Sequence, residues 1–203
     1  MNAPRGGEVH GHAHPAPGQA WSAAPERTTE RTAEPAGLRG LVVTASNRAS
    51  QGVYADKGGP VLAEGLEQLG FAVDGPLVVP DGDPVEQALR EGVAAGYDVI
   101  LTTGGTGISP TDRTPDATAR VLDYEIPGIP QAIRAENLAK VPTAALSRGL
   151  AGVAGHTLIV NLPGSTGGVR DGLAVLSRIL LHAVDQIRGG DHPRPPAPTG
   201  SQS

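Results

Sequence analysis

The chain has 203 residues, a formal net charge of −5 at pH 7 and no cysteine. The negative charge gives no electrostatic case for nucleic acid or an anionic membrane as a partner. The lack of cysteine excludes disulfides, thiolate metal sites and a cysteine nucleophile. No apolar run could span a bilayer and the N-terminus lacks the apolar core of a signal peptide, so we expect a cytoplasmic protein.

The length predicts one domain with two tails. Residues 1–37 are rich in Pro, Ala, Gly, Thr and charge, and we expect disorder because they cannot bury enough apolar surface. Their alternating His10, His12 and His14 could bind adventitious metal, but the pattern favours a disordered tail without a metal role. Residues 190–203 are Pro-rich and are also expected to be disordered, which leaves residues 38–189 as the folded domain.

Apolar periodicity and the Gly and Pro signals predict an alternation of strands and helices along the folded domain. In chain order they are strand 38–45, helix 57–69, strand 71–79, a helix from Asp83 as N-cap to Gly96, strand 98–103, helix 114–122 with Thr114 as N-cap, helix 129–139, strands 148–153 and 157–161, and a last helix 169–187. This alternation predicts an α/β fold, a three-layer αβα arrangement with a mainly parallel central sheet.

Polar loops follow four of the predicted strands. Because ligands of open parallel sheets bind at the carboxyl ends of the strands, we expect all four loops on one rim, where they form one site. The loops are 46–51, 80–83, 104–112 and 161–165.

The loop 104–112 carries the strongest chemical signal. Gly104, Gly105 and Gly107 let backbone N–H groups approach an anion, and Thr106 adds a hydroxyl. Asp112 stands beside this phosphate-friendly loop, and a carboxylate repels phosphate unless a cation lies between them. The loop is neither a Walker A loop nor Gly-x-Gly-x-x-Gly, and taken alone it is better interpreted as a tight connection without a ligand.

Asp81 and Asp112 come from different loops and could share a divalent cation such as Mg²⁺. Each also has a structural interpretation. Asp81 could be a turn residue before Gly82, and Asp112 could hydrogen-bond the backbone of Thr114 ahead of the next helix. Their joint appearance on the rim favours the metal site.

Three further polar residues lie in or near the rim loops. Arg48 could meet a phosphate with its guanidinium fork, or could be a solvated loop charge. Ser147 and Asn161 could hydrogen-bond a polar ligand, although Asn161 could equally form a local turn. No histidine is placed to act as a base with a serine partner, and His156 is expected in a turn, so a hydrolase triad is not predicted.

Together these residues resemble a known family. Residues 101–107, Leu-Thr-Thr-Gly-Gly-Thr-Gly, and 112–118, Asp-Arg-Thr-Pro-Asp-Ala-Thr, look like the signature of the molybdopterin adenylyltransferases, the MogA/MoaB group of molybdenum cofactor biosynthesis. Further blocks match in the same order, at 46–57, 80–81, 127–128, 146–148 and 161–164, and the likeness covers nearly all of the folded domain. The signature also occurs, less faithfully, in the molybdate-insertion enzymes.

The resemblance implies transfer of AMP from Mg-ATP to the terminal phosphate of molybdopterin, with release of pyrophosphate. It implies that Asp81 and Asp112 are required for the reaction through Mg²⁺. The nucleotide side would be formed by Gly104, Gly105, Thr106 and Gly107 with Arg48, and the molybdopterin side by Ser147 and Asn161. It also implies a homotrimer with one site per subunit, and hand-over of the product to a molybdate-insertion enzyme.

Three positions depart from the family pattern. Asn47 stands where many members have Asp, Asn137 where some members have a Ser that helps hold molybdopterin, and 165–167 replaces a stretch that usually contains proline. Asn137 keeps the capacity to hydrogen-bond molybdopterin. The alternative function is therefore a non-catalytic pterin- or nucleotide-binding paralogue, a carrier or assembly subunit. Asn47 favours that alternative, whereas the presence of both Asp81 and Asp112 favours the enzyme.

Overall fold

The computed structural model describes residues 37–190, so all but one residue of each predicted tail, with His10, His12 and His14, lie outside the described residues. Within residues 37–190 the chain forms a six-stranded sheet in the order β2-β1-β3-β6-β5-β4. The four strands β2, β1, β3 and β6 are parallel, β5 pairs antiparallel with β6, and β4 pairs antiparallel with β5. The strands are β1 (Arg39–Ala45), β2 (Ala72–Val79), β3 (Val99–Thr103), β4 (Tyr124–Glu125), β5 (Ala151–Ala154) and β6 (Thr157–Leu162).

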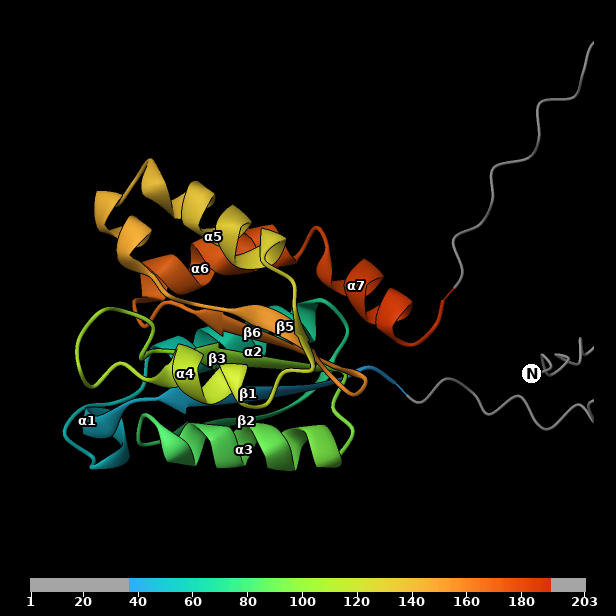
Figure 1. The fold of residues 1–203 in the computed structure, drawn as a ribbon, viewed down its shortest axis with the longest axis horizontal. Helices are drawn as coiled ribbons and strands as arrows, with labels where there is room; N and C mark the ends of the chain where they lie inside the picture. The colour runs from blue at the N-terminus through green and yellow to red at the C-terminus, as the bar shows by residue number, and fades with distance from the viewer. Residues whose placement is uncertain (1–36, 191–203) are drawn as a thin grey trace, which may run out of the picture. The chain divides into compact units, whose positions relative to one another are not determined.

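Helices cover both faces of this sheet, which confirms the predicted α/β fold with a mainly parallel sheet (Figure 1). One face carries α2, α5, α6 and α7, and the other carries α3 and α4. The helices of the described part of the chain are α1 (Asn47–Ser50), α2 (Gly58–Gln68), α3 (Asp83–Ala94), α4 (Thr114–Ala119), α5 (Gly128–Leu138), the 3-10 helix η1 (Pro142–Leu146), α6 (Thr166–Leu176) and α7 (Leu180–Ile187).

The central strands are apolar on both faces because helices cover both. In β1, Val42 packs with Leu62 and Leu66 of α2, whereas its neighbours Leu41 and Val43 belong to the cluster on the α3 face. Full burial of such a side chain contributes about 1.5–3 kcal/mol. The two cores hold the sheet rigid, so the loops at its carboxyl ends start from fixed positions.

Two predicted helix starts are wrong by one residue. The N-cap of α3 is Gly82 rather than Asp83, and that of α4 is Arg113 rather than Thr114. Thr114 is fully buried, and its hydroxyl donates to the Asp81 carboxylate instead of to its own helix. A tertiary partner has therefore replaced the local cap.

Several predicted boundaries are also wrong. The last helix is two helices, α6 and α7, with a break at 177–179. The helix from Thr114 ends at Ala119 rather than 122, and β5 begins at Ala151 rather than 148. Short elements that the sequence did not predict are α1, β4 and η1. None of these differences moves a loop away from the rim.

Among the helices of residues 37–190, none has the length and apolar character that crossing a membrane requires.

Candidate active site

The loops that follow the parallel strands contact one another at one edge of the sheet. Asn47, after β1, accepts through Oδ1 a hydrogen bond of 3.1 Å from the backbone N–H of Asp81, after β2. The Thr103 hydroxyl at the end of β3 donates to the Pro163 carbonyl after β6, at 2.8 Å. The prediction that these loops share one rim is confirmed.

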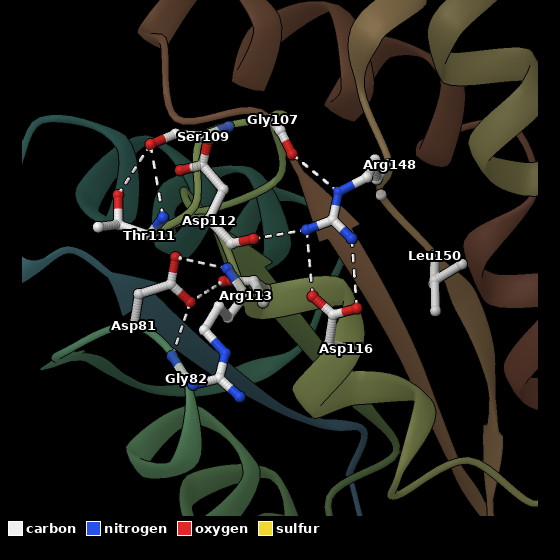
Figure 2. Close-up of polar contacts among 12 residues, drawn as sticks. Asp81, Gly82, Gly107, Ser109, Thr111, Asp112, Arg113, Asp116, Arg148 and Leu150 are labelled. Atoms are coloured by element: carbon white, nitrogen blue, oxygen red, sulfur yellow. Dashed lines mark hydrogen bonds and ion pairs between the residues drawn. The ribbon is translucent and has the colours of Figure 1, made fainter.

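The carboxylate of Asp81 connects the loop after β2 to the start of α4 (Figure 2). Its Oδ1 accepts from the Gly82 N–H at 2.7 Å and from the Thr114 hydroxyl at 3.0 Å, and its Oδ2 accepts from the Arg113 N–H at 3.1 Å. The turn interpretation of Asp81 accounts only for the bond to Gly82. The other two bonds hold the end of the central loop, 104–112, against the loop after β2.

Asp112 lies at the end of the central loop and is half-buried. Its Oδ2 accepts from the Ser109 N–H at 3.0 Å, so the carboxylate closes a turn of its own loop. The structural alternative, a bond to the Thr114 backbone, is wrong, because the Thr114 N–H donates to the Gly105 carbonyl at 3.2 Å. Within the described residues Oδ1 of Asp112 has no hydrogen-bond partner, which leaves this oxygen free to bind a cation.

Two glycines of the central loop are required by close approach and by backbone conformation. Gly104 has a φ of +94°, and a Cβ there would lie 2.3 Å from the Ala45 carbonyl oxygen. Gly105 has a φ of +60°, and a Cβ there would lie 1.9 Å from Oδ2 of Asp81. L-residues other than glycine rarely adopt such φ values. The loop therefore approaches both the β1 end and Asp81 as closely as a backbone can.

Arg148, just before β5, binds the central loop and α4 through all three nitrogens of its guanidinium group (Figure 2). Nε donates to the Gly107 carbonyl at 2.9 Å, Nη2 donates to the Asp112 carbonyl, and Nη1 and Nη2 pair with the two carboxylate oxygens of Asp116 at 3.2 and 3.1 Å. This pairing holds the pKa of the Asp116 carboxyl below its usual range and raises the pKa of Arg148. Sequence reasoning gave Arg148 no role, although it stands in the matched block 146–148.

A cavity of about 450 Å³ lies between the central loop, α5 and the start of α6. It brings together five of the residues that the sequence analysis selected, which are Thr106, Gly107, Asn137, Ser147 and Asn161. Asn137 is buried and donates from Nδ2 to the Ile133 carbonyl at 2.9 Å. The three residues predicted for molybdopterin thus share one cavity, which we call the first cavity.

Charged side chains that the sequence analysis missed also line the first cavity. Arg134 donates from Nη1 to the carbonyls of Ser147 (3.3 Å) and Gly149 (3.2 Å). Lys140 pairs with Asp171 at 2.7 Å, and this carboxylate raises the pKa of the lysine. All three charged residues come from helix faces or helix ends, so no motif spacing marks them, and only the packing of α5 against α6 brings them to the cavity.

Asn161 uses its whole side-chain amide inside the protein. Nδ2 donates to the hydroxyls of Thr102 (3.0 Å) and Thr118 (2.9 Å), and Oδ1 accepts from the Leu150 N–H at 3.1 Å. These bonds join β6 to β3, to α4 and to the segment before β5. Asn161 therefore shapes the floor of the first cavity, and its amide is not a local turn former.

We expect Asn161→Ala to lower the free energy of unfolding by about 2–4 kcal/mol, because it removes the partners of buried polar groups. Urea unfolding followed by circular dichroism measures this, with the midpoint falling at an unchanged slope. Gln131→Ala on the exposed side of α5 is the matched control and should change the midpoint little. Equal midpoints for both variants would contradict the structural role of Asn161.

A second cavity, of about 490 Å³, lies beside the ends of β1 and β3. Gly104 lines this cavity, together with Asp56, Lys57 and Tyr54. The predicted phosphate residue Arg48 is not among its lining residues. Its guanidinium carbon lies 5.2 Å from the centre of the Tyr54 ring, so Arg48 packs on the outside of the cavity wall.

The two cavities divide the predicted phosphate loop between them. Gly104 lines the second cavity, Thr106 and Gly107 line the first, and Ser165 lines both. Gly105, which lines neither, stands against Asp81. The structure thus brings the predicted loop and cavity residues to one end of the sheet, but it does not make the four residues 104–107 one continuous phosphate surface.

The charged groups suit a metal that is held partly by substrate. In the described part of the chain no group of three or more His, Cys, Asp or Glu side chains could form a protein cage for a metal ion. Mg²⁺ is commonly bound by one or two carboxylates together with substrate phosphates. Asp112 fits that pattern through its free Oδ1, whereas Asp81 already accepts three hydrogen bonds.

Comparison with known proteins agrees with this geometry. Residues 41–183 match the profile of a family described as "Probable molybdopterin binding domain". The chain belongs to this family. The matched range runs from β1 into α7 and therefore includes every residue of the candidate site that belongs to the sheet rim or to the first cavity.

Family members of known name cover the same region. The chain is 41% identical over 155 residues to the molybdopterin adenylyltransferase of Escherichia coli, a match that covers 72% of this chain and 80% of that protein. It is 58% identical, with a TM-score of 0.72, to the molybdopterin biosynthesis Mog protein from Mycobacterium ulcerans, covering 74% of this chain and 99% of that one.

A third relative is longer than this chain. The chain is 36% identical over 156 residues to the molybdenum cofactor biosynthesis bifunctional protein of Chlorobaculum tepidum. That match covers 76% of this chain, but the chain spans only about half, 50%, of the bifunctional protein.

Proposed function

We propose that the protein is a molybdopterin adenylyltransferase. In this reaction an oxygen of the terminal phosphate of molybdopterin forms a bond to the α-phosphorus of ATP. The bond from that phosphorus to the bridging oxygen of the β-phosphate breaks, and pyrophosphate leaves with the electron pair. Because one anion attacks another, catalysis consists mainly of positioning and of charge neutralisation, and it needs no nucleophilic side chain.

The observation that carries the proposal is the course of the central loop between two cavities. Gly104 of this loop reaches the second cavity and Thr106 reaches the first, while Asp112 ends the loop and Asp81 accepts from the N–H that follows it. Volumes of about 450 and 490 Å³ each suit a ligand of small-molecule size. A two-substrate transfer needs this arrangement, with the reacting phosphates meeting at the loop.

We assign molybdopterin to the first cavity and the nucleotide to the side of Gly104. Arg134 supports this assignment, because no carboxylate of the described residues lies within ion-pair distance of it and its hydrogen bonds go to carbonyls. Its positive charge is therefore available to an anionic ligand such as a phosphate. Ser147 and the Asn137 amide supply polar groups for the pterin, and Gly104 serves the nucleotide phosphates. Thr106 and Gly107 line the first cavity and would face the phosphate of molybdopterin.

Mg²⁺ would be held by Asp112, with Asp81 close to it. When bound, the ion would offset the negative charge of the ATP phosphates. The chain's own contribution is to hold the two carboxylates in fixed orientations, through the Ser109 N–H for Asp112 and through the Arg113 N–H and Thr114 hydroxyl for Asp81.

Asn47 was the residue that favoured the non-catalytic carrier, and its contact with Asp81 does not favour that alternative. The Asn47 side chain accepts from the Asp81 N–H, so it stabilises the loop of a candidate catalytic acid. An oxygen at this position suffices for that role, and Asn provides one as Asp does. The adenylyltransferase names of relatives such as the E. coli protein also favour the catalytic function.

The resemblance further supports a cytoplasmic homotrimer that hands its product to a molybdate-insertion enzyme. These parts of the proposal rest on the family likeness alone. Light scattering on the purified full chain tests the trimer, since a monomeric mass at micromolar concentration would contradict it.

The decisive test incubates the full chain with molybdopterin, Mg²⁺ and ATP labelled at the α-phosphate. We expect label in molybdopterin and one pyrophosphate for each adenylyl group transferred, and neither product when molybdopterin is omitted. Calorimetric titration of molybdopterin accompanies the assay. Binding of molybdopterin without transfer would identify a carrier, and the absence of both would contradict any molybdopterin function.

A further inference from the structure

The exposed part of the central loop is folded on itself. The Asp112 N–H donates to the Ser109 carbonyl at 2.9 Å, the Ser109 N–H donates to Asp112 Oδ2 at 3.0 Å, and the Ser109 and Thr111 hydroxyls lie 3.0 Å apart. Within the part of the chain that the structure describes, the hydrogen bonds of residues 108–111 stay inside this turn. Its orientation on the domain must therefore be set at its two ends.

Two opposite charges hold those ends (Figure 2). The carboxylate of Asp81 accepts from the N–H that follows Asp112, and the guanidinium of Arg148 donates to the carbonyls of Gly107 and Asp112. Asp81 thus binds an N–H group and Arg148 binds carbonyl groups of the same stretch of backbone. Asp112 thus stands between two anchors, one of which is already a candidate catalytic acid.

The charge of Arg148 is used within the protein. Both oxygens of Asp116 pair with it in a bidentate arrangement, which is the strongest geometry for an arginine–carboxylate pair. An arginine neutralised in this way is a poor partner for a substrate phosphate. Its fork geometry instead fits the fixed positions of two carbonyls and a carboxylate, which the single ammonium group of lysine could not satisfy together.

Arg148 also connects the loop to the first cavity. Its neighbours Ser147 and Gly149 line that cavity, and Arg134 holds the carbonyls of both. The Arg148 N–H donates to the Thr106 carbonyl at 2.8 Å, so the backbone of this segment is tied to the loop as well. Arg148 therefore fixes the position of Asp112 relative to the wall of the cavity where one substrate would bind.

We propose that Arg148 is a positioning residue for adenylyl transfer, which sets the orientation of Asp112 relative to the first cavity. This role rests on the proposed function. Arg148 touches the loop and not the reacting atoms, so its loss should affect the transfer step more than the binding of molybdopterin. A misplacement of about 1 Å at a reacting group can cost roughly 10²-fold in rate.

The first test compares the kinetics of Arg148→Ala, Arg148→Lys and the control Arg178→Ala, at an exposed position between α6 and α7. For Arg148→Ala we expect kcat to fall roughly 10²-fold with little change in the KM for molybdopterin. Guanidinium chloride at non-denaturing concentration should restore part of the lost kcat, and Arg148→Lys should resemble Arg148→Ala. Arg178→Ala should keep wild-type values.

A second test uses the same variants without substrate. Amide hydrogen exchange at residues 107–113 should become faster in Arg148→Ala and stay unchanged in Arg178→Ala. Asp116→Asn should share part of both effects, and combined with Arg148→Ala it should add little, because the two residues act as a pair.

The outcomes separate this inference from the proposed function. An active wild-type protein whose folded Arg148→Ala variant keeps its kcat, or loses only molybdopterin affinity, would overturn the positioning role. Unchanged exchange at 107–113 in that variant would overturn it as well. A wild-type protein without transfer activity would overturn the proposed function and this role together.

Discussion

Asp112→Asn is expected to reduce adenylyl transfer by roughly 10²–10³-fold, because it removes the negative charge that would hold Mg²⁺, the ion that offsets the phosphate charges in the transition state. The fold should survive. An amide oxygen can still accept from the Ser109 N–H, and the side chain is half-buried in a loop and outside both apolar clusters. Initial rates with Mg²⁺ and ATP measure the first effect, and thermal unfolding measures the second.

Asp83→Asn is the matched control for the change at Asp112. The Asp83 side chain is 82% exposed and pairs with Arg120 on the outside of the domain. Exposed pairs of this kind contribute little, about 0–1 kcal/mol, so the control should keep both activity and melting temperature. Near-wild-type turnover of a folded Asp112→Asn variant would contradict the proposed role of this carboxylate.

The layered fold follows from local sequence signals. Val99, Ile100 and Leu101 form a short apolar run that predicts a strand covered on both faces, and the structure buries all three completely. The Gly and Pro signals separate such runs from the helices between them. Because parallel strands end at the same edge, the order of elements also predicts the rim where Asp81 contacts the end of the central loop, next to Asp112.

Helix ends were predicted less well, since they depend on partners far along the chain. Thr114 has the pattern of an N-cap, but the Asp81 carboxylate, 33 residues away, takes its hydroxyl. The break between α6 and α7 cannot be seen in the apolar spacing, because Leu176 of α6 and Leu180 of α7 are buried in the same core. Apolar spacing indicates which residues face the same core. It does not indicate where one helix ends and the next begins with a different axis.

The candidate site could be predicted only in part for the same reason. Motif spacing identifies the carboxylates and the glycines, which lie in loops. It does not identify Arg134 or Lys140, which reach the first cavity only because α5 packs beside α6. No motif marks Arg148 in the sequence. Its role follows only from the fold, because the central loop lies against its guanidinium group.

Gly105→Ala is expected to lower both stability and activity. The sequence predicts that this glycine lets the backbone approach an anion. In the structure a Cβ would instead lie 1.9 Å from Asp81 Oδ2 and 2.5 Å from the Thr114 hydroxyl oxygen. Asp81 would have to leave its place between the Gly82, Arg113 and Thr114 donors, and the end of the central loop would lose that anchor.

Gly96→Ala is the control that distinguishes the clash at Gly105 from the strain of a positive φ. Gly96 has a φ of +74°, close in kind to the +60° of Gly105, but a Cβ at Gly96 would meet no atom within 4 Å. Its variant should show only the cost of a left-handed alanine, about 1–2 kcal/mol, with full activity. Gly105→Ala should lose more stability than this, and its kcat should fall because Asp81 loses its fixed orientation. If urea unfolding and initial rates gave the two glycine variants the same small cost and full activity, Asp81 could move aside freely, and its fixed orientation would not matter for transfer.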